Sequence, residues 1–362
     1  MNINQVIDSN PIERAQTPTA ALYRDHSLYQ TMIENIFNKY PFWVGHEVCF
    51  DEKNNLFPIE VYPGMLDEHL LLSKKGDNYH LMSNVCTHRG AIIEKENSAK
   101  KRIICPYHGR RWDLEGNFQF MPGFKEVENF PSECDHLKKV ELYRRNSFLW
   151  GNLSCNNFGS LMPESLLNRY LYFFPFEQLE KAANFENEYT IPCNWALYCE
   201  NYLEGFHIPF VHPGLNEALS NDEYPVIDGE DCILQIGMAA EGTDCFDLPQ
   251  DHPNYGSRVG AYYFYLFPST MLNFYPWGLS VNQILPQEID SVIAKYQTYV
   301  LPGAKIDNSA GAGLDKVELE DQEVVMRVQK GIGSRFYSRG RYSPEHEKGV
   351  YFFHQLISRA LL

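Results

Sequence analysis

The stretch "VCTHRGAIIEKENSAKKRIICPYHGRRWDLEGN", residues 85–117, contains two short pairs of metal-binding residue types. Cys86 and His88 form the first pair, Cys105 and His108 form the second, and sixteen residues lie between the two pairs. Thiolates and imidazoles are ligands of both zinc and iron–sulfur clusters. The stretch therefore predicts a metal site, and the order of the four residues bears on which metal it holds.

A structural zinc site with two cysteines and two histidines is the simpler interpretation of this set. Zinc fingers, however, take two cysteines from one segment and two histidines from another. Here each segment offers one residue of each kind. That distribution suits a [2Fe–2S] cluster in which one iron binds both thiolates and the other binds both imidazoles. The pattern favours the cluster over zinc.

Length and composition limit the domain count, the partners and the cellular location that the whole chain can have. Its 362 residues are enough for two domains, or for one domain with a large insertion. A formal net charge of −16 argues against a nucleic-acid partner. The first thirty residues lack a continuous apolar core, and nine scattered cysteines are typical of a cytoplasmic protein. Residues 259–287 lack charges but contain three prolines, so we expect buried strands there and no membrane helix.

The residue patterns divide the chain into three segments and predict an α+β fold. Residues 1–41 are expected to be mostly helical and to pack on the C-terminal domain. Residues 42–153 contain short strand-like runs separated by turns, which indicate a small all-β domain with the Cys/His pairs on loops. Residues 154–362 should form a second domain with a helix near 194–208, strands through 232–300, and helices near 317–331 and 344–361.

The stretch "NWALYCENYLEGFHIPFVHP", residues 194–213, suggests a second site. On a single helix, Glu200, Glu204 and His207 would lie on one face, and the opposite face would carry an aromatic stripe of Trp195, Tyr198, Tyr202 and Phe206. We expect Pro209 to end this helix and His212 to lie on the following turn. A surface helix with a solvated acidic face would explain the pattern without any site.

The alternative is a mononuclear metal site. His207 and His212 would be half of a two-histidine, one-carboxylate set for non-haem Fe(II). The third ligand is predicted to be Asp321, because it lies at the centre of an otherwise apolar helix face made of Val317, Val324, Val325, Val328 and Ile332. Glu320 and Glu323 are expected to point away from that face. Burial of a carboxylate in an apolar helix face costs free energy unless the charge is compensated. A metal ion could compensate it, and so could a structural hydrogen bond.

The motif "CTHRG…CPYHG" resembles the Rieske motif, and "ENYLEGFHIPFVHP" is similar to the iron-binding segment of Rieske non-haem iron oxygenases. The resemblance implies a small all-β Rieske [2Fe–2S] domain and a helix-grip catalytic domain with mononuclear iron on His207, His212 and Asp321. It also implies a homotrimer in which a carboxylate bridges the cluster of one subunit and the iron of its neighbour. Glu204 is at that position, where most relatives have Asp. The pair Arg110-Arg111 departs from the family pattern and is expected to make the local surface more basic.

The resemblance implies a terminal oxygenase that activates O₂ and hydroxylates a small organic substrate, by monooxygenation, dioxygenation or oxidative demethylation. An alternative is a monooxygenase specific for a quaternary ammonium compound of the choline, betaine or carnitine type, and a weaker alternative is a Rieske electron carrier without oxygenase activity. The chain has no dinucleotide fingerprint, so electrons would come from NAD(P)H through a separate reductase, with or without a ferredoxin.

Substrate-binding residues are not identified by the sequence. A group of aromatic residues in the uncharged strands could line a pocket by cation–π attraction or by stacking, although strand alternation allows only about half of them to do so. They are Tyr262, Phe264, Phe274, Tyr275 and Trp277.

Overall fold

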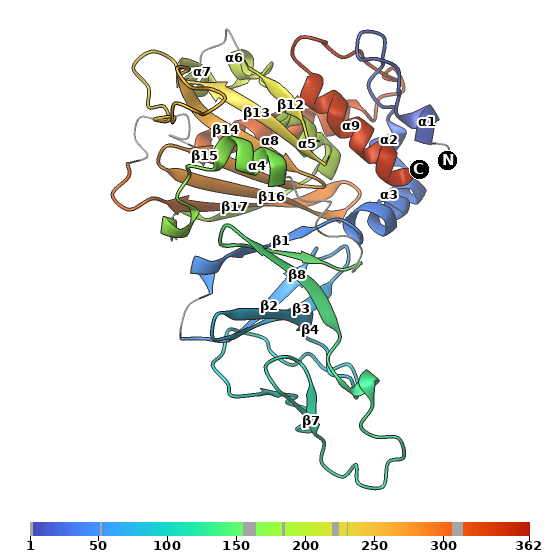
Figure 1. The fold of residues 1–362 in the computed structure, drawn as a ribbon. Coiled ribbons are helices and arrows are strands. Elements are labelled where there is room, and N and C mark those ends of the chain that lie inside the picture. Colours follow the sequence, from blue (N-terminus) through green and yellow to red (C-terminus); the bar gives the residue numbers. More distant parts are fainter. Residues whose placement is uncertain are drawn as a thin grey trace. The chain divides into compact units, whose positions relative to one another are not determined.

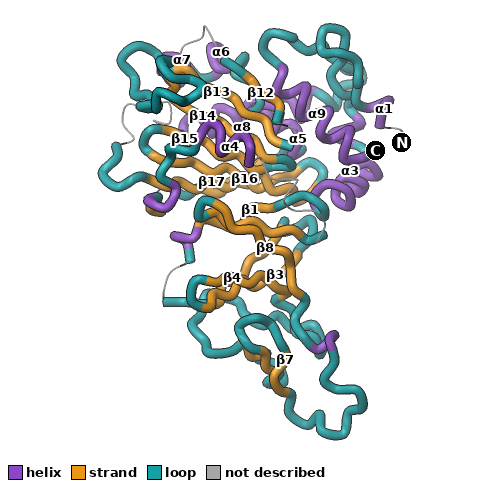
Figure 2. Tube along the Cα trace, viewed as in Figure 1, coloured by secondary structure: helices purple, strands orange, loops and turns teal. Residues whose placement is uncertain are grey.

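The computed structural model describes residues 3–50, 53–154, 164–182, 185–218, 224–229, 231–305 and 314–362. Two compact units form, one from Pro41–Phe158 and the other from Met1–Tyr40 together with Gly159–Leu362. Figure 1 shows the course of the chain, and Figure 2 shows that the first unit consists mainly of strands and long loops, whereas helices cover the sheet of the second. Among the described residues, no helix has the length and hydropathy needed to cross a bilayer.

The unit Pro41–Phe158 is built from two antiparallel sheets. A six-stranded sheet has the order β1-β9-β8-β4-β3-β2, and a three-stranded sheet has the order β5-β6-β7. The strands are β1 (Phe42–His46), β2 (Leu56–Val61), β3 (Glu68–Lys75), β4 (Asn78–Ser83), β5 (Ile103–Ile104), β6 (Arg111–Trp112), β7 (Phe118–Phe120), β8 (Lys139–Arg145) and β9 (Phe148–Asn152). Short 3₁₀ helices span Glu47–Cys49 and Glu133–Asp135. Both Cys/His pairs lie in loops between strands, as the sequence predicts.

The second unit contains a long antiparallel sheet of order β10-β17-β16-β15-β14-β13-β12, with β11 also paired to β17. Its strands are β10 (Glu180–Lys181), β11 (Asn187–Ile191), β12 (Val226–Asp228), β13 (Cys232–Met238), β14 (Val259–Leu266), β15 (Thr270–Tyr275), β16 (Gly278–Glu288) and β17 (Ser291–Val300). The uncharged residues 259–287 thus form three neighbouring strands, which confirms the prediction of buried strands. The long sheet with helices on it is the helix-grip domain that the resemblance implies.

Helices of this unit come from the N-terminal segment and from the part of the chain that follows the β unit. They are α1 (Ile3–Val6), α2 (Ala21–Arg24), α3 (His26–Met32), the π-helix Ile33–Phe37, α4 (Glu164–Leu171), the 3₁₀ helix Phe176–Gln178, α5 (Trp195–Tyr202), α6 (Ile208–Val211), α7 (Pro213–Ala218), α8 (Leu314–Gly331) and α9 (Lys348–Leu361). Figure 1 shows α9 beside the N-terminal helices. Two hydrogen bonds join these segments, from the Tyr351 hydroxyl to the Asn10 carbonyl and from Gln355 to the Asp8 carbonyl.

The prediction of one helix over 194–208 is wrong. The helix α5 ends at Tyr202, and a separate one-turn helix, α6, begins at Ile208. Gly205 lies in the break between the two helices. Pro209 occupies the first turn of α6, where a missing N–H costs nothing, so it starts a helix and does not end one.

The turn after α5 is held in place by α9. A Cβ atom added to Gly349 would lie 2.3 Å from the carbonyl oxygen of Leu203, so the first turn of α9 contacts the backbone that leads to Glu204 and His207. Only glycine permits this approach.

Gly349→Ala should therefore destabilise the catalytic unit. Overpacking of this kind costs about 1–3 kcal/mol, which corresponds to a fall in melting temperature of several degrees for a unit of this size. The matched control is Gly331→Ala at the end of α8, where no atom lies within 4 Å of an added Cβ. Differential scanning calorimetry of both variants tests this, and equal melting temperatures would contradict the proposed contact.

Candidate metal centres

The two Cys/His loops of the β unit have the same backbone geometry. The amide of Cys86 donates to the Ala91 carbonyl, and the amide of Cys105 donates to the Arg110 carbonyl, five residues ahead in each case. Each loop also has a glycine amide that donates back to the cysteine carbonyl, from Gly90 in the first loop and from Gly109 in the second. Both glycines have positive φ values, 70° and 71°, which non-glycine side chains rarely adopt. The two loops are thus built as a matched pair.

The side chains of the loops pair by type. Burial raises the pKa of Cys86, and a hydrogen bond with the neighbouring Cys105 thiol adds to the shift, so the two sulfur atoms are adjacent. The rings of His88 and His108 lie 4.9 Å apart. This arrangement places two thiols together and two imidazoles together, which is what a two-iron cluster with unlike irons requires.

A single zinc ion fits this arrangement poorly. The ligands of a tetrahedral zinc site all lie within about 4 Å of one another. Among the described residues, no three of these four side chains have ligand atoms within 4.8 Å of one another. In addition, Nδ1 of His88 is buried without a hydrogen-bond partner in the described part of the chain. A buried ring nitrogen in that state is available to a metal, so the residues fit a [2Fe–2S] cluster better than zinc.

Arg110 does not make the surface basic, contrary to the prediction. Its side chain is only 2% exposed and forms an ion pair with Asp135, while three aromatic rings lie 5.1–5.8 Å from its guanidinium carbon. The carbonyl of Asp135 accepts a hydrogen bond of 2.9 Å from Nε1 of Trp112. Because Arg110 directly follows the second loop, the pair anchors that loop to the 3₁₀ helix Glu133–Asp135.

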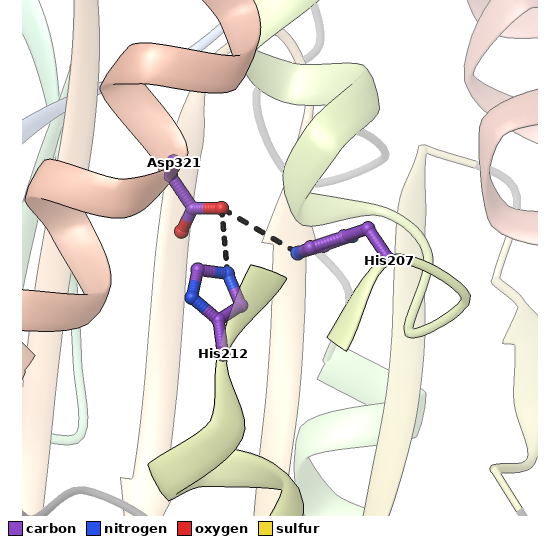
Figure 3. A group of neighbouring side chains, drawn as sticks. All are labelled: His207, His212 and Asp321. Carbon is purple, nitrogen blue, oxygen red and sulfur yellow. Dashed lines mark hydrogen bonds and ion pairs between the residues drawn. The ribbon is translucent and has the colours of Figure 1, made fainter. Parts of the chain in front are cut away.

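In the catalytic unit, the residues predicted from three separate positions lie together. His207 and His212 flank the one-turn helix α6, and Asp321 projects from the middle of α8 (Figure 3). Oδ1 of Asp321 lies 2.9 Å from Nε2 of His212 and 3.4 Å from Nε2 of His207. Their ligand atoms lie within 4.8 Å of one another, and among the described residues no other group of three meets this condition. We call these residues the His–His–Asp triad.

Each histidine of the triad is oriented by a carboxylate on its other ring nitrogen. Nδ1 of His207 lies 2.6 Å from Oε1 of Glu204, and Nδ1 of His212 lies 2.8 Å from Oε2 of Glu320. The amide of His207 also donates to Oε2 of Glu204, at 3.0 Å. Such contacts fix the ring orientation and direct Nε2 of each histidine toward Asp321.

The carboxylate and the imidazoles of the triad stabilise one another's charged forms and so shift their pKa values. Burial by itself would raise the pKa of Asp321, but hydrogen bonds from His207 and His212 outweigh it and lower that pKa below its usual value. Burial also opposes protonation of His207, yet Asp321 and Glu204 raise its pKa to about 9. His207 therefore favours its protonated form at neutral pH. A metal cation bound between Glu204 and Asp321 would replace that positive charge.

Two expectations about this site are wrong. Glu320 does not point away from the triad, since it contacts His212. Val328 is 41% exposed, so the buried stripe of α8 is narrower than predicted. Glu200 does not belong to the site either, because its carboxylate accepts hydrogen bonds from the Tyr23 hydroxyl at 2.8 Å and from Nε2 of His354 at 2.9 Å.

A cavity of about 110 Å³ lies beside the triad, between the sheet and the helices α5 and α8. Of the aromatic residues suggested by the sequence, only Tyr275 lines it. Tyr262 and Phe274 face the other side of the sheet, where they contact Tyr170 and Phe174. The lining residues that the sequence did not identify include Tyr198, Tyr202, Tyr224, Tyr263, Asn273, Asn282, Tyr296 and Glu318.

The Arg110–Asp135 pair gives a test of the anchoring of the second loop. Asp135→Asn leaves a buried guanidinium without its counter-charge, and we expect a loss of about 3 kcal/mol in unfolding free energy. The control is Glu115→Gln, which breaks the exposed pair with Lys75 in the same unit and should cost less than about 1 kcal/mol. Guanidinium unfolding followed by circular dichroism measures both, and similar losses would show that burial of the pair is unimportant.

Comparison with known proteins places this geometry in a family. Residues 46–131 match the family model "Rieske [2Fe-2S] domain", and residues 176–362 match "Ring hydroxylating alpha subunit (catalytic domain)". Choline monooxygenase from Arabidopsis thaliana is 27% identical over 97% of this chain and 84% of its own length. The carnitine monooxygenase oxygenase subunit of Escherichia coli K12 is 28% identical over 97% of this chain and 95% of its own length.

Among solved structures, a quaternary ammonium Rieske monooxygenase superposes with a TM-score of 0.81 at 22% identity, over 98% of this chain and 100% of the other. At that identity the likeness concerns the fold. The catalytic-domain model, in contrast, covers more than half of the 362 residues and matches the unit that contains the His–His–Asp triad. The chain therefore belongs to the ring-hydroxylating alpha subunits and is the oxygenase component of a Rieske non-haem iron oxygenase.

Proposed function

We propose that this oxygenase binds catalytic iron at His207, His212 and Asp321 and hydroxylates a small alkylammonium compound. The observation that carries the proposal is the convergence of two Nε2 atoms and one carboxylate oxygen within 4.8 Å, beside a cavity. Iron held by two histidines and one carboxylate keeps coordination positions open for O₂ and substrate. The chain's own contribution is to hold three ligands on one side and to leave the cavity side free.

Cys86, His88, Cys105 and His108 are proposed as the cluster ligands. The matched loops, the adjacent sulfurs and the buried Nδ1 of His88 support this assignment. A [2Fe–2S] cluster supplies single electrons. Since the chain contains no dinucleotide fingerprint, we propose that a separate NAD(P)H-dependent reductase reduces it, with or without a ferredoxin. The E. coli relative is likewise described as an oxygenase subunit.

Glu204 is proposed to connect the two metal sites. Both of its oxygen atoms are engaged with His207, one on the ring and one on the amide, so Glu204 follows any movement of that ligand. The proposal includes a homotrimer, in which the carboxylate would face the cluster of a neighbouring subunit, and a cytoplasmic location.

The cavity favours a quaternary or substituted ammonium group over an aromatic ring. Tyr263 has three tyrosine neighbours, with ring centroids 6.5 Å from Tyr202, 6.4 Å from Tyr224 and 6.0 Å from Tyr275. We call these four residues the tyrosine cage. All four line the cavity, and aromatic rings attract an alkylammonium cation by cation–π interaction. Choline and carnitine, for which two of the relatives are named, each contain a quaternary ammonium group. Hydroxylation at an N-methyl group would release formaldehyde.

His207→Ala should separate the two metal sites. Anaerobically purified wild type is expected to contain about three irons and two acid-labile sulfides per chain, from a cluster and one further iron. The variant should keep two irons, two sulfides and the visible spectrum of the cluster, and lose both the third iron and product formation. His26→Ala, on an exposed histidine at the start of α3 in the same unit, is the control and should keep all three irons. Two irons in the wild type, even after Fe(II) addition, would contradict the proposed centre.

Glu320→Gln should weaken iron binding without removing a ligand. Loss of the carboxylate that orients His212 is expected to lower Fe(II) affinity about 10–100-fold. Glu323→Gln is the matched control on the same helix, because Glu323 is exposed and pairs with Arg327. Titration of the iron-depleted protein with Fe(II), followed by metal analysis after desalting, measures the effect. Equal affinities for the two variants would mean that Glu320 does not position His212.

A further inference from the structure

The ion pair of Arg110 with Asp135 contacts both loops of the proposed cluster site. The hydroxyl of Thr87, which lies between the two proposed ligands of the first loop, donates a hydrogen bond of 3.2 Å to the Asp135 carbonyl. In the second loop, the amide of Cys105 donates a hydrogen bond of 2.8 Å to the carbonyl of Arg110. The two charges of the pair are therefore held at fixed positions relative to the four proposed ligands.

The two charges of this pair are buried to different degrees. The Arg110 side chain is 2% exposed and that of Asp135 is 17% exposed. Burial alone would raise the pKa of Asp135, but hydrogen bonds from Ser132 and Arg110 lower it below its usual value, so the carboxylate is ionised at neutral pH. A guanidinium keeps its proton in proteins. The positive end of the pair is thus permanent, and it is the end that water screens less.

Aromatic rings lie between the guanidinium and one of the proposed ligands. The ring of Phe130 is 5.6 Å from the guanidinium carbon of Arg110 and 4.9 Å from the ring of Phe124, which in turn lies 5.6 Å from the ring of His88. Burial lowers the pKa of His88, and neighbouring positive charges, which include Arg110, lower it further. Because charges act over a longer range in apolar surroundings than in water, the guanidinium is close enough to influence the cluster site.

The charge of such a cluster changes on reduction. Two ferric ions, two sulfides, two thiolates and two neutral imidazoles have no net charge in sum. After one-electron reduction by the reductase, which makes or breaks no bond, the same set carries one negative charge. A positive charge nearby therefore stabilises the reduced state more than the oxidised state, and a negative charge does the opposite.

From these features we infer that Arg110 is an electrostatic tuning residue, which raises the reduction potential of the cluster held between the two loops. Asp135 fixes the guanidinium in place and, being more exposed, offsets only part of its charge. The inference rests on the proposed cluster ligands and adds a side chain that is not itself a ligand. Its consequence is a cluster that accepts an electron from the reductase more readily and gives it up less readily to the catalytic iron.

The first test changes the positive charge. Redox titration of the holoenzyme at pH 7, followed by visible circular dichroism of the cluster, measures the potential. Arg110→Gln should make reduction about 10-fold less favourable, which corresponds to a potential about 59 mV lower for one electron. Arg110→Lys keeps the charge and should retain most of the wild-type potential. Equal potentials in the wild type and Arg110→Gln would overturn the inference, and so would equal shifts in the two variants, which would indicate a disturbed loop.

The second test changes the negative charge and should give the opposite sign. Asp135→Asn removes the counter-charge of the guanidinium and should raise the potential. The double variant Arg110→Gln/Asp135→Asn should have a potential below that of the wild type and above that of Arg110→Gln, because the more deeply buried charge has the larger effect. A fall in potential in Asp135→Asn would overturn the inference, since loosening of the loops would then determine the potential.

The exposed pair Lys75–Glu115 of the same unit provides matched controls. Lys75→Gln and Glu115→Gln make the same changes of charge, and each should change the equilibrium of reduction less than about 2-fold, because water screens both groups. Two acid-labile sulfides per chain confirm that a variant is folded with its cluster. If the Arg110 variants lose the cluster, the sign of the shift in Asp135→Asn decides; if Asp135→Asn loses it, the two Arg110 variants decide.

The outcomes separate this inference from the proposed function. If the wild type contains no acid-labile sulfide even after anaerobic reconstitution with iron and sulfide, the proposed cluster ligands are wrong and the inference falls with them. If the cluster is present and Arg110→Gln leaves its potential unchanged, the proposed ligands stand and only the tuning role is wrong.

Discussion

The catalytic unit depends on one half-buried carboxylate. Asp321 lies in the middle of α8, partly shielded from solvent, and is stable there as an anion because two imidazoles donate to it. Those imidazoles come from the two ends of α6, a helix of four residues. A second layer of carboxylates, Glu204 and Glu320, then fixes both rings. The proposed metal site is thus a network of alternating acidic and basic groups, in which each group stabilises the charge of its neighbours.

Elements far apart in the chain support this network. The turn that leads from α5 to His207 is contacted by Gly349 of α9, and α9 in turn packs beside the N-terminal helices. The sheet supplies the opposite wall, where Tyr263, Asn273 and Tyr296 project from three strands toward the cavity. The site is therefore distributed over nearly the whole length of the catalytic unit, while its chemically reactive residues occupy only two short segments.

The Rieske unit carries its four proposed cluster ligands on two loops. Two glycines with positive φ give both loops the same turn, and the buried pair of Arg110 with Asp135 ties the second loop to a neighbouring 3₁₀ helix. Aromatic rings surround the guanidinium of Arg110, so a residue that looks like surface charge in the sequence belongs to the interior. Local sequence could not reveal this, because the partner Asp135 is 25 residues away.

The sequence by itself determined the residue types and spacings of both proposed metal sites, the family, and the division into an all-β part and a mixed part. It could do so because Cys-x-His, Cys-x-x-His and the His207–His212 spacing are short-range patterns whose chemistry needs few other residues. Only the tertiary structure decided that α5 stops before Glu204, that Glu320 orients His212, and that Tyr263 rather than Tyr262 faces the cavity. The register of antiparallel strands and the rotation of α8 about its axis set these contacts. Both are fixed by packing between segments distant in sequence, which no local periodicity records.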